Sequence, residues 1–267
     1  MNTCAEPVSK NNSQSENTAI VLVAFGSTAP QTVKTYEKIE QSFKKAFPHL
    51  NISWAYTSEI VIRKLRASGK KINNVDEVIK NLVKNGYKSI LLQSLHIMPG
   101  EEYLSITTQD STAKIAIGEP LLASDNDIQT VAQILIPLLT GDTPTVVAAH
   151  GNSKYPELNK PLHKIALILE KTCPNSVLCT VEGPPGTEPM QKISVAVKKI
   201  NIVNFLPFML IAGMHVQEDL TGPDSSSWKN ILGVTNVNLL EPLGDMPKIH
   251  EIFISHCKNA LTKLGIN

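Results

Sequence analysis

Short runs of consecutive apolar residues alternate along this chain with amphipathic segments of helical period. The run at 19–26, AIVLVAFG, has no polar position and ends in glycine, which is typical of a strand covered on both faces of a sheet. The segment at 31–47 carries apolar residues at helical spacing and stops before Pro48. Because helices that follow strands in this way form crossover connections, the pattern predicts an α/β fold with parallel sheets.

The same alternation continues to the end of the chain. Further strands are predicted at 51–58, 88–97, 143–151, 176–183 and 202–213. Further helices are predicted at 59–68, 75–86, 157–172, 189–201 and 246–264.

A faint internal repeat indicates that the fold is doubled. The dipeptide FG ends a predicted strand at 25–26, and HG ends another at 150–151. The tripeptide EPL occurs at 119–121 and again at 241–243, at nearly the same offset. We therefore expect two similar lobes, each a parallel sheet flanked by helices.

The bulk composition narrows the class of protein. The chain has 267 residues, of which 42% are hydrophobic, so it is long enough for two lobes, which we place at 19–140 and 141–267. A net charge of +1 with no basic run argues against a nucleic-acid partner. No stretch reaches the roughly 20 apolar residues that cross a membrane. The polar segment 1–18 is expected to be a flexible tail without a signal peptide.

The cysteines indicate a reducing compartment. None of the four cysteines stands in a CxxC pair or at zinc-site spacing. Free, mostly buried thiols are therefore expected, and with them a cytoplasmic location.

Three residues with metal-ligating side chains stand where predicted strands of the second lobe end. His150 and Glu182 each end a strand, and His215 closely follows a third. Because ligands bind beyond the carboxyl ends of parallel strands, these side chains are expected at one rim. Two imidazoles and a carboxylate suit Co²⁺, Ni²⁺, Fe²⁺ or Zn²⁺ and leave coordination positions open. The alternative is that each histidine only hydrogen-bonds to its own loop.

The first lobe offers weaker candidates. His96 ends a predicted strand with Glu101 and Glu102 nearby, which fits either a functional group or a loop anchor. The segment AFGSTAP, around Ser27, precedes a helix whose backbone N–H groups are suited to an anion. No GxGxxG, GxxxxGK[ST] or GxSxG motif is present, which argues against dinucleotide, P-loop and serine-hydrolase sites.

Several of these segments together resemble a known family. In order and spacing the chain is similar to the anaerobic-pathway sirohydrochlorin cobalt chelatases, which belong to the class II tetrapyrrole chelatases. The segments that carry the resemblance are AFGS, QSLHIMPGEEY, AAHG, VEG, AGMHVQEDLTGPDSSSW and EPLG. It extends from residue 19 to the end of the chain. The resemblance implies two similar lobes that face each other across a tetrapyrrole cleft.

The resemblance also implies an activity. It points to a lyase that inserts Co²⁺ into sirohydrochlorin without ATP, as a step of cobalamin biosynthesis. Co²⁺ is then a substrate metal, and no organic cofactor is expected. By position, His150, Glu182 and His215 take the family's metal-ligand roles, and His150 or His215 is expected to accept the pyrrole protons.

Substrate contacts are expected from the rim of the cleft. Sirohydrochlorin carries many carboxylates, so Lys154 and the backbone near Ser27 are candidates to bind them. His96 matches the histidine of the family's QSLH motif and is expected to contact the substrate. Lys154 stands near a place where family members often carry a further histidine, and the segment VEGPPG is unusually rich in proline.

Two alternatives remain open at this point. The same scaffold inserting Ni²⁺ or Fe²⁺ has the same ligand types, because ligand chemistry does not separate these ions. A metal- or tetrapyrrole-binding protein without turnover would also need such a site. The oligomeric state is not readable from the sequence, although lobes this small are compatible with a homo-oligomer.

Overall fold

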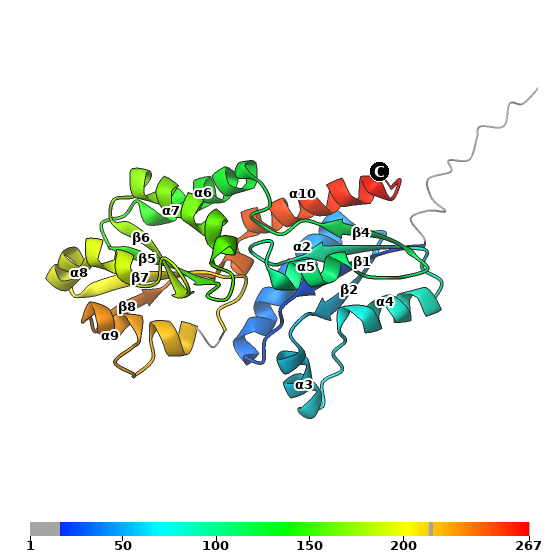
Figure 1. Ribbon diagram of the computed structural model, residues 1–267, viewed down its shortest axis with the longest axis horizontal. Coiled ribbons are helices and arrows are strands. Elements are labelled where there is room, and N and C mark those ends of the chain that lie inside the picture. Colours follow the sequence, from blue (N-terminus) through cyan, green and yellow to red (C-terminus); the bar gives the residue numbers. More distant parts are fainter. Residues whose placement is uncertain (1–16, 214–215, 267) are drawn as a thin grey trace, which may run out of the picture.

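A computed structural model of the chain describes residues 17–213 and 216–266 and contains two four-stranded parallel sheets (Figure 1). The strand order is β2-β1-β3-β4 in the first sheet and β6-β5-β7-β8 in the second. The second order repeats the first, strand for strand, and all neighbouring strands run parallel. The predicted α/β fold of two similar lobes is thus confirmed.

The first sheet and its helices are built from the first half of the chain. Its strands are β1 (Thr18–Ala24), β2 (Asn51–Tyr56), β3 (Ser89–Ser94) and β4 (Lys114–Gly118). Its connections contain the 3₁₀ turn η1 (Pro30–Thr32) and the helices α2 (Val33–Ala46), α3 (Glu59–Ala67), α4 (Val75–Lys84) and α5 (Glu101–Thr107). Helix α6 (Asp125–Leu139) then leads to the second sheet.

The second sheet follows the same plan. Its strands are β5 (Thr145–Gly151), β6 (Ser176–Glu182), β7 (Ile202–Phe208) and β8 (Asn236–Leu239). Its helices are α7 (Lys160–Thr172), α8 (Ser194–Ile200), α9 (Trp228–Leu232) and α10 (Pro247–Lys263). Short helical turns lie between them: η2 (Pro156–Asn159), η3 (Glu188–Lys192), η4 (Val216–Leu220) and η5 (Leu243–Asp245).

Strand β1 explains why a continuous apolar run specifies the centre of this fold. Every residue of the strand is buried. Ile20 and Leu22 face a core that includes residues of α2 and α10, whereas Val21 and Val23 face a second core with α4. Because successive strand residues point to opposite faces, a strand covered on both sides has no polar position.

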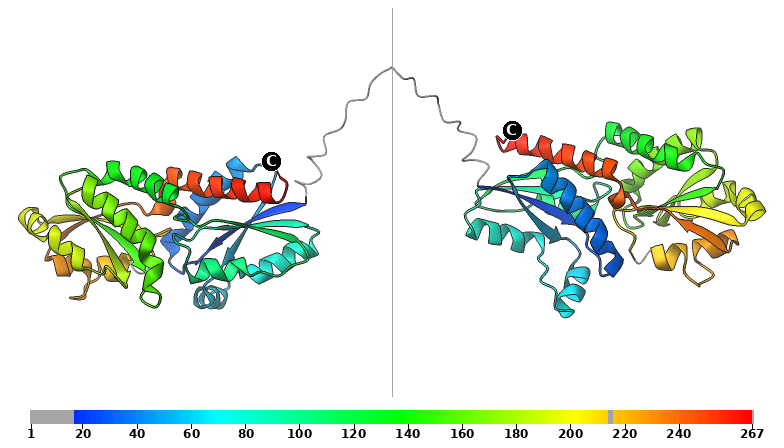
Figure 2. Two further views of the ribbon diagram at one scale, coloured as in Figure 1. Left: turned by 45° about the horizontal axis from the view of Figure 1, so that its top comes forward. Right: turned by 180° about the vertical axis from the view of Figure 1, so that it is seen from behind.

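The last helix returns to the first lobe. In both views α10 leaves the second sheet and runs along the first (Figures 1 and 2), where it contacts β3, β4, α2 and α6. Phe253 of α10 is fully buried in a core that also contains Phe43 of α2 and Leu169 of α7. One hydrophobic core therefore joins the two lobes. The chain passes from the first sheet to the second between α6 and β5, and α10 returns to the first.

Several element predictions need correction. Strand β7 ends at Phe208 rather than 213, and the predicted helix at 189–201 is a turn, η3, followed by α8. The helix predicted from 157 begins at Lys160, after a 3₁₀ turn. At 209–213 the apolar run continues beyond the end of the strand, and at 157–159 and 189–192 the chain is a 3₁₀ turn that a helical spacing pattern does not distinguish from an α-helix.

Candidate metal centre

His150 and Glu182 lie at the ends of neighbouring strands. His150 is next to last in β5 and Glu182 is last in β6, and the two strands pair in parallel with Gly151 opposite Glu182. Both side chains are exposed at the carboxyl edge of the second sheet. An imidazole and a carboxylate therefore stand at the ends of two neighbouring strands, at the edge of the sheet where α/β proteins bind ligands.

Glycine at two positions allows this close approach. Gly151 has φ +76°, and a Cβ on it would lie 2.0 Å from the backbone oxygen of Glu182. Gly183 has φ +69°, and a Cβ there would lie 2.3 Å from the oxygen of Asn152. L-residues with side chains rarely adopt this conformation, and neither gap admits a side chain. The dipeptides HG and EG are thus needed for the two loops to pack together.

Hydrogen bonds to neighbouring groups orient both side chains. The Nδ1 atom of His150 lies 3.0 Å from the carbonyl oxygen of Gly151, which only accepts, so Nδ1 donates. The neutral ring then carries its lone pair on Nε2, the form in which imidazole binds metals. The hydroxyl of Ser153 donates to Oε2 of Glu182 at 3.2 Å. Sequence reasoning missed Ser153, because a serine in a polar loop carries no distinguishing signal.

His215 lies outside the described residues, so its predicted place beside His150 and Glu182 remains a prediction. The chain on either side of it is described. Gly213 and Val216 are joined by a backbone hydrogen bond of 3.2 Å. An ideal Cβ on Gly213 would lie 3.9 Å from the hydroxyl oxygen of Ser27, so the segment that leads to His215 meets the carboxyl edge of the first sheet.

Ser27 and His96 both lie on that edge of the first lobe. The hydroxyl of Ser27 accepts a hydrogen bond from the backbone N–H of Ala29 at 3.1 Å. The ring of His96 is hydrogen-bonded to the hydroxyls of Ser94 (2.9 Å, Nδ1) and Thr57 (3.4 Å, Nε2). Burial lowers the pKa of His96 to about 4, so its ring is neutral near pH 7. His96 is therefore not a cation for substrate carboxylates.

Lys154 connects the two lobes. Its ammonium forms an ion pair of 2.8 Å with Glu101 at the start of α5 and lies 4.7 Å from the ring centroid of Tyr155. The hydrogen bond to Glu101 raises the pKa of Lys154, which keeps the group charged. The predicted role of Lys154 in substrate binding stays a prediction, and in this structure its ammonium is paired with a carboxylate of the opposite lobe.

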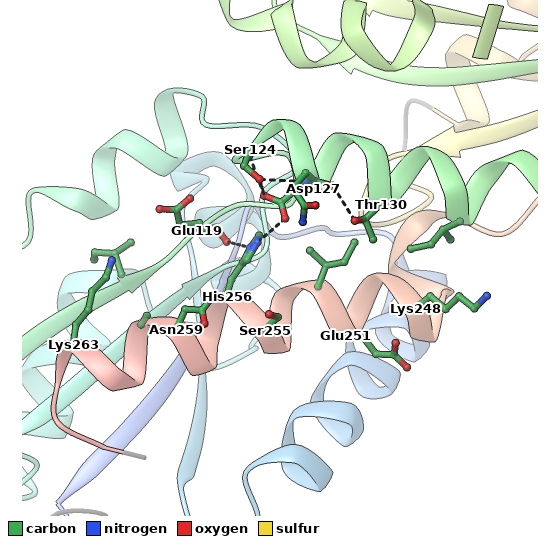
Figure 3. Close-up of a pocket in the computed structure, with 15 residues that line it drawn as sticks. Glu119, Ser124, Asp127, Thr130, Lys248, Glu251, Ser255, His256, Asn259 and Lys263 are labelled. Atoms are coloured by element: carbon green, nitrogen blue, oxygen red, sulfur yellow. Dashed lines mark hydrogen bonds and ion pairs between the residues drawn. The ribbon is translucent and has the colours of Figure 1, made fainter. Parts of the chain in front are cut away.

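A groove of about 620 Å³ between α6 and α10 lies away from these residues (Figure 3). His256 points from α10 to the carboxylate of Asp127 (3.1 Å) and to the backbone oxygen of Glu119 (3.1 Å). Asp127 also accepts hydrogen bonds from Ser124 in the cap of α6. The groove contains none of the predicted ligands, and its histidine anchors α10 to the first lobe.

Within residues 17–213 and 216–266, no three His, Cys, Asp or Glu side chains are grouped so as to hold a metal ion. The predicted set has only two members in these ranges. No helix in the described part of the chain is both long and apolar enough to span a membrane.

Comparison with known proteins decides the family. The family model described as "Cobalt chelatase (CbiK)" matches residues 18–262. The chain belongs to the cobalt chelatase (CbiK) family. The resemblance noted from the sequence motifs is thereby confirmed.

Two proteins named as sirohydrochlorin cobaltochelatases match nearly the whole chain. The sirohydrochlorin cobaltochelatase CbiKC of Nitratidesulfovibrio vulgaris is 26% identical over 261 residues, which cover 92% of this chain and 91% of that protein. The sirohydrochlorin cobaltochelatase of Salmonella typhimurium is 28% identical over 264 residues, covering 91% and 96%.

Solved chelatase structures share the fold. SirB from Bacillus subtilis with Fe³⁺ superposes with a TM-score of 0.62 at 15% identity, over 93% of this chain and 98% of that one. CbiX, the terminal enzyme for siroheme biosynthesis in denitrifying bacteria, gives 0.57 at 14% identity, over 91% and 99%. At these identities the likeness concerns the two-lobed architecture alone.

Proposed function

We propose that this chain inserts Co²⁺ into sirohydrochlorin, without ATP or an organic cofactor, as a lyase of cobalamin biosynthesis. The observation that carries the proposal is the match to the cobalt chelatase family over residues 18–262. The adjacent exposed ends of β5 and β6, with His150 and Glu182, support it independently.

In the proposed reaction, His150, Glu182 and His215 bind the incoming Co²⁺ ion. Ligation removes water from an ion that dehydrates slowly and holds it against one face of the macrocycle. Binding of both substrates turns a two-body encounter into a positioned one. His150 or His215 then accepts the pyrrole protons, because an imidazole nitrogen that has released the metal has a free lone pair and can act as a general base.

The first lobe, together with Lys154 of the second lobe, is proposed to bind the tetrapyrrole. The backbone near Ser27 offers N–H groups to a substrate carboxylate, and Lys154 offers a cation once it leaves Glu101. Neutral His96 is suited to donate or accept a hydrogen bond rather than to pair with an anion. The cleft between the lobes, in which the macrocycle would sit, is part of this proposal.

A steady-state assay tests the reaction. Purified protein mixed with sirohydrochlorin and excess Co²⁺ is expected to change the tetrapyrrole absorbance many times per protein molecule, faster than with Ni²⁺ or Fe²⁺. A change that stops at one equivalent would identify a carrier protein instead. A higher rate with Ni²⁺ or Fe²⁺ would assign the same scaffold to a different metal.

Substitution of the proposed ligands tests the site. His150→Ala and Glu182→Gln are each expected to lower turnover by at least about 100-fold, because direct ligands matter more than their outer partners. The matched control is His163→Ala, which removes an exposed histidine from α7 of the same lobe. Circular dichroism should be unchanged in all three variants. Wild-type turnover in His150→Ala would contradict the assignment.

Location and boundaries are part of the same proposal. Cys173, Cys179 and Cys257 are free, buried thiols, and burial raises the pKa of Cys179 to about 12. Such inert thiols accord with a cytoplasmic protein. We propose residues 19–140 and 141–267 as the two lobes. A homo-oligomer is compatible with lobes of this size.

A further inference from the structure

Asn159 is a fully buried polar residue directly before α7. Asparagine in this place commonly caps the helix with its side chain. Here the backbone is already helical (φ −77°, ψ −2°), and the side chain makes no capping hydrogen bond. Its side-chain amide instead donates to backbone oxygens of two other loops.

The amide instead joins the two loops that follow the proposed ligands. Nδ2 of Asn159 donates to the backbone oxygen of Asn152 at 3.2 Å and to that of Pro184 at 3.0 Å. Asn152 is the second residue after His150, and Pro184 is the second after Glu182. One side chain thus ties the loop after β5 to the loop after β6.

The same two loops are already in close contact through glycine. The short approach of Gly183 to the oxygen of Asn152 leaves little room for the loops to adjust. Thr180 holds the second loop in a turn, since its hydroxyl donates to the oxygen of Gly183 at 2.6 Å and accepts from the N–H of Gly186 at 2.8 Å. The crosslink by Asn159 therefore fixes the separation of two otherwise well-formed loops.

We propose that Asn159 is a positioning residue that sets the spacing of His150 and Glu182 and thereby the affinity for Co²⁺. The inference rests on the proposed roles of those two residues as ligands. Asn159 does not touch the metal, and it acts through two backbone carbonyls. Outer contacts of this kind typically change metal affinity by about 10- to 100-fold.

The test is a Co²⁺ titration followed by the visible d–d absorption of the bound ion. Asn159→Asp keeps the shape but replaces both donor hydrogens by an acceptor that repels two carbonyl oxygens. Asn159→Ala removes the donors without adding charge. Both variants are expected to raise the Kd for Co²⁺ by about 10- to 100-fold and to alter the d–d bands, because ligand spacing changes the coordination geometry.

The matched control is Asn201→Asp. Asn201 joins two connections at the opposite edge of the same sheet: Nδ2 donates to the hydroxyl of Thr235 at 2.9 Å, and Oδ1 accepts from the N–H of Thr235 at 3.1 Å. Its substitution also breaks a crosslink between loops and should lower stability. It is expected to leave the Co²⁺ Kd and spectrum unchanged.

Co²⁺ binding by the His150 variant distinguishes a wrong positioning role for Asn159 from a wrong assignment of the metal ligands. If His150→Ala abolishes Co²⁺ binding while both Asn159 variants keep the wild-type Kd and spectrum, the positioning role is wrong and the ligand assignment stands. If His150→Ala leaves Co²⁺ binding unchanged, the ligand assignment itself is wrong. An equal effect in Asn201→Asp would reduce Asn159 to a general structural contact. Should Asn159→Asp fail to fold, Asn159→Ala decides by the same two readouts.

Discussion

The backbone at Gly151 decides how closely the ends of β5 and β6 approach. Its substitution by alanine places a Cβ at 2.0 Å from the oxygen of Glu182, in a left-handed conformation of φ +76°. Backbone strain of this kind costs about 1–3 kcal/mol. We expect Gly151→Ala to lower the free energy of unfolding by at least that amount in urea, and to weaken Co²⁺ binding by separating the two loops.

Gly69 supplies the control for that experiment. It has φ +82° at the end of α3, but a Cβ on it would meet nothing within 4 Å. Gly69→Ala therefore carries the conformational penalty without the collision. It should lower stability less than Gly151→Ala and leave Co²⁺ affinity unchanged. Equal effects of the two substitutions on Co²⁺ binding would show that the close approach is unimportant.

His96 makes stability depend on pH. Its pKa is about 4 in the folded protein, because burial disfavours the charged ring, and about 6.5 when unfolded. Between these values the unfolded chain binds more protons, so stability falls as pH is lowered from about 6.5 to 4. Replacing His96 by glutamine should remove up to about 1.4 kcal/mol per pH unit of that slope.

Urea unfolding at several pH values measures this slope. Burial also lowers the pKa of His250. Its contribution to the pH dependence of stability is the same in wild type and His96→Gln, so it cancels when the two stability curves are subtracted. Parallel stability curves for wild type and His96→Gln between pH 6.5 and 4 would mean that the His96 ring is hydrated and titrates normally.

At the scale of elements, the sequence pattern located the centre of each sheet better than its edges. The strands at 19–26 and 143–151 were correctly predicted as apolar runs and proved to be β1 and β5, each of which pairs with a strand on both sides within its own sheet. The edge strands β4 and β8 were missed. The apolar run of β4 is only three residues long, and β8 reads NVNL with mostly exposed positions, so neither stands out as a strand.

The sequence pattern likewise indicated some residues of the candidate site and not others. The positions of His150 and Glu182 at strand ends were predictable, because a histidine or acid at the end of a buried strand contradicts the apolar pattern before it. Asn159 was not. The expected helix at 157–172 placed it inside an amphipathic segment, whereas the helix begins at Lys160 and the asparagine faces two loops. A side chain that bonds only to distant backbone atoms leaves no periodic signal.

The ion pair between Lys154 and Glu101 is proposed to open when substrate binds, and kinetic measurements can test this. Substrate carboxylates are proposed to take Lys154 from Glu101. Lys154→Ala should raise the KM for sirohydrochlorin several-fold, and Glu101→Gln should lower it by releasing the ammonium. Both effects should shrink at high salt, because exposed charges are screened.

Kinetics at two ionic strengths measures this exchange, with circular dichroism to confirm that both variants are folded. Since the pair is exposed, the thermal midpoint should hardly change in either variant. An identical KM for wild type and Lys154→Ala would exclude the lysine from substrate binding and leave the pair as a surface contact between the lobes.

At the scale of the whole molecule, α10 makes the first lobe depend on the end of the chain. The helix buries Ile249, Phe253 and Leu261 in the core that joins both lobes. A fragment of residues 1–140 would expose the face of the first sheet that α10 covers. We expect this fragment to lack a cooperative unfolding transition, and addition of residues 246–267 through a flexible linker to restore it.

Circular dichroism during urea titration distinguishes the two fragments. Loss of α10 removes several large side chains from a packed core, and each such loss typically costs about 2–5 kcal/mol. Cooperative unfolding of 1–140 alone would mean that the first lobe is an independent domain and that α10 is an accessory.

The position of bound Co²⁺ is the most direct test of the account as a whole. Anomalous diffraction recorded at the cobalt edge from a crystal soaked in Co²⁺ locates the ion without reference to activity. We predict one strong peak beside Nε2 of His150 and the carboxylate of Glu182. A peak at His256 and Asp127 in the α6–α10 groove, with none at His150, would contradict the account.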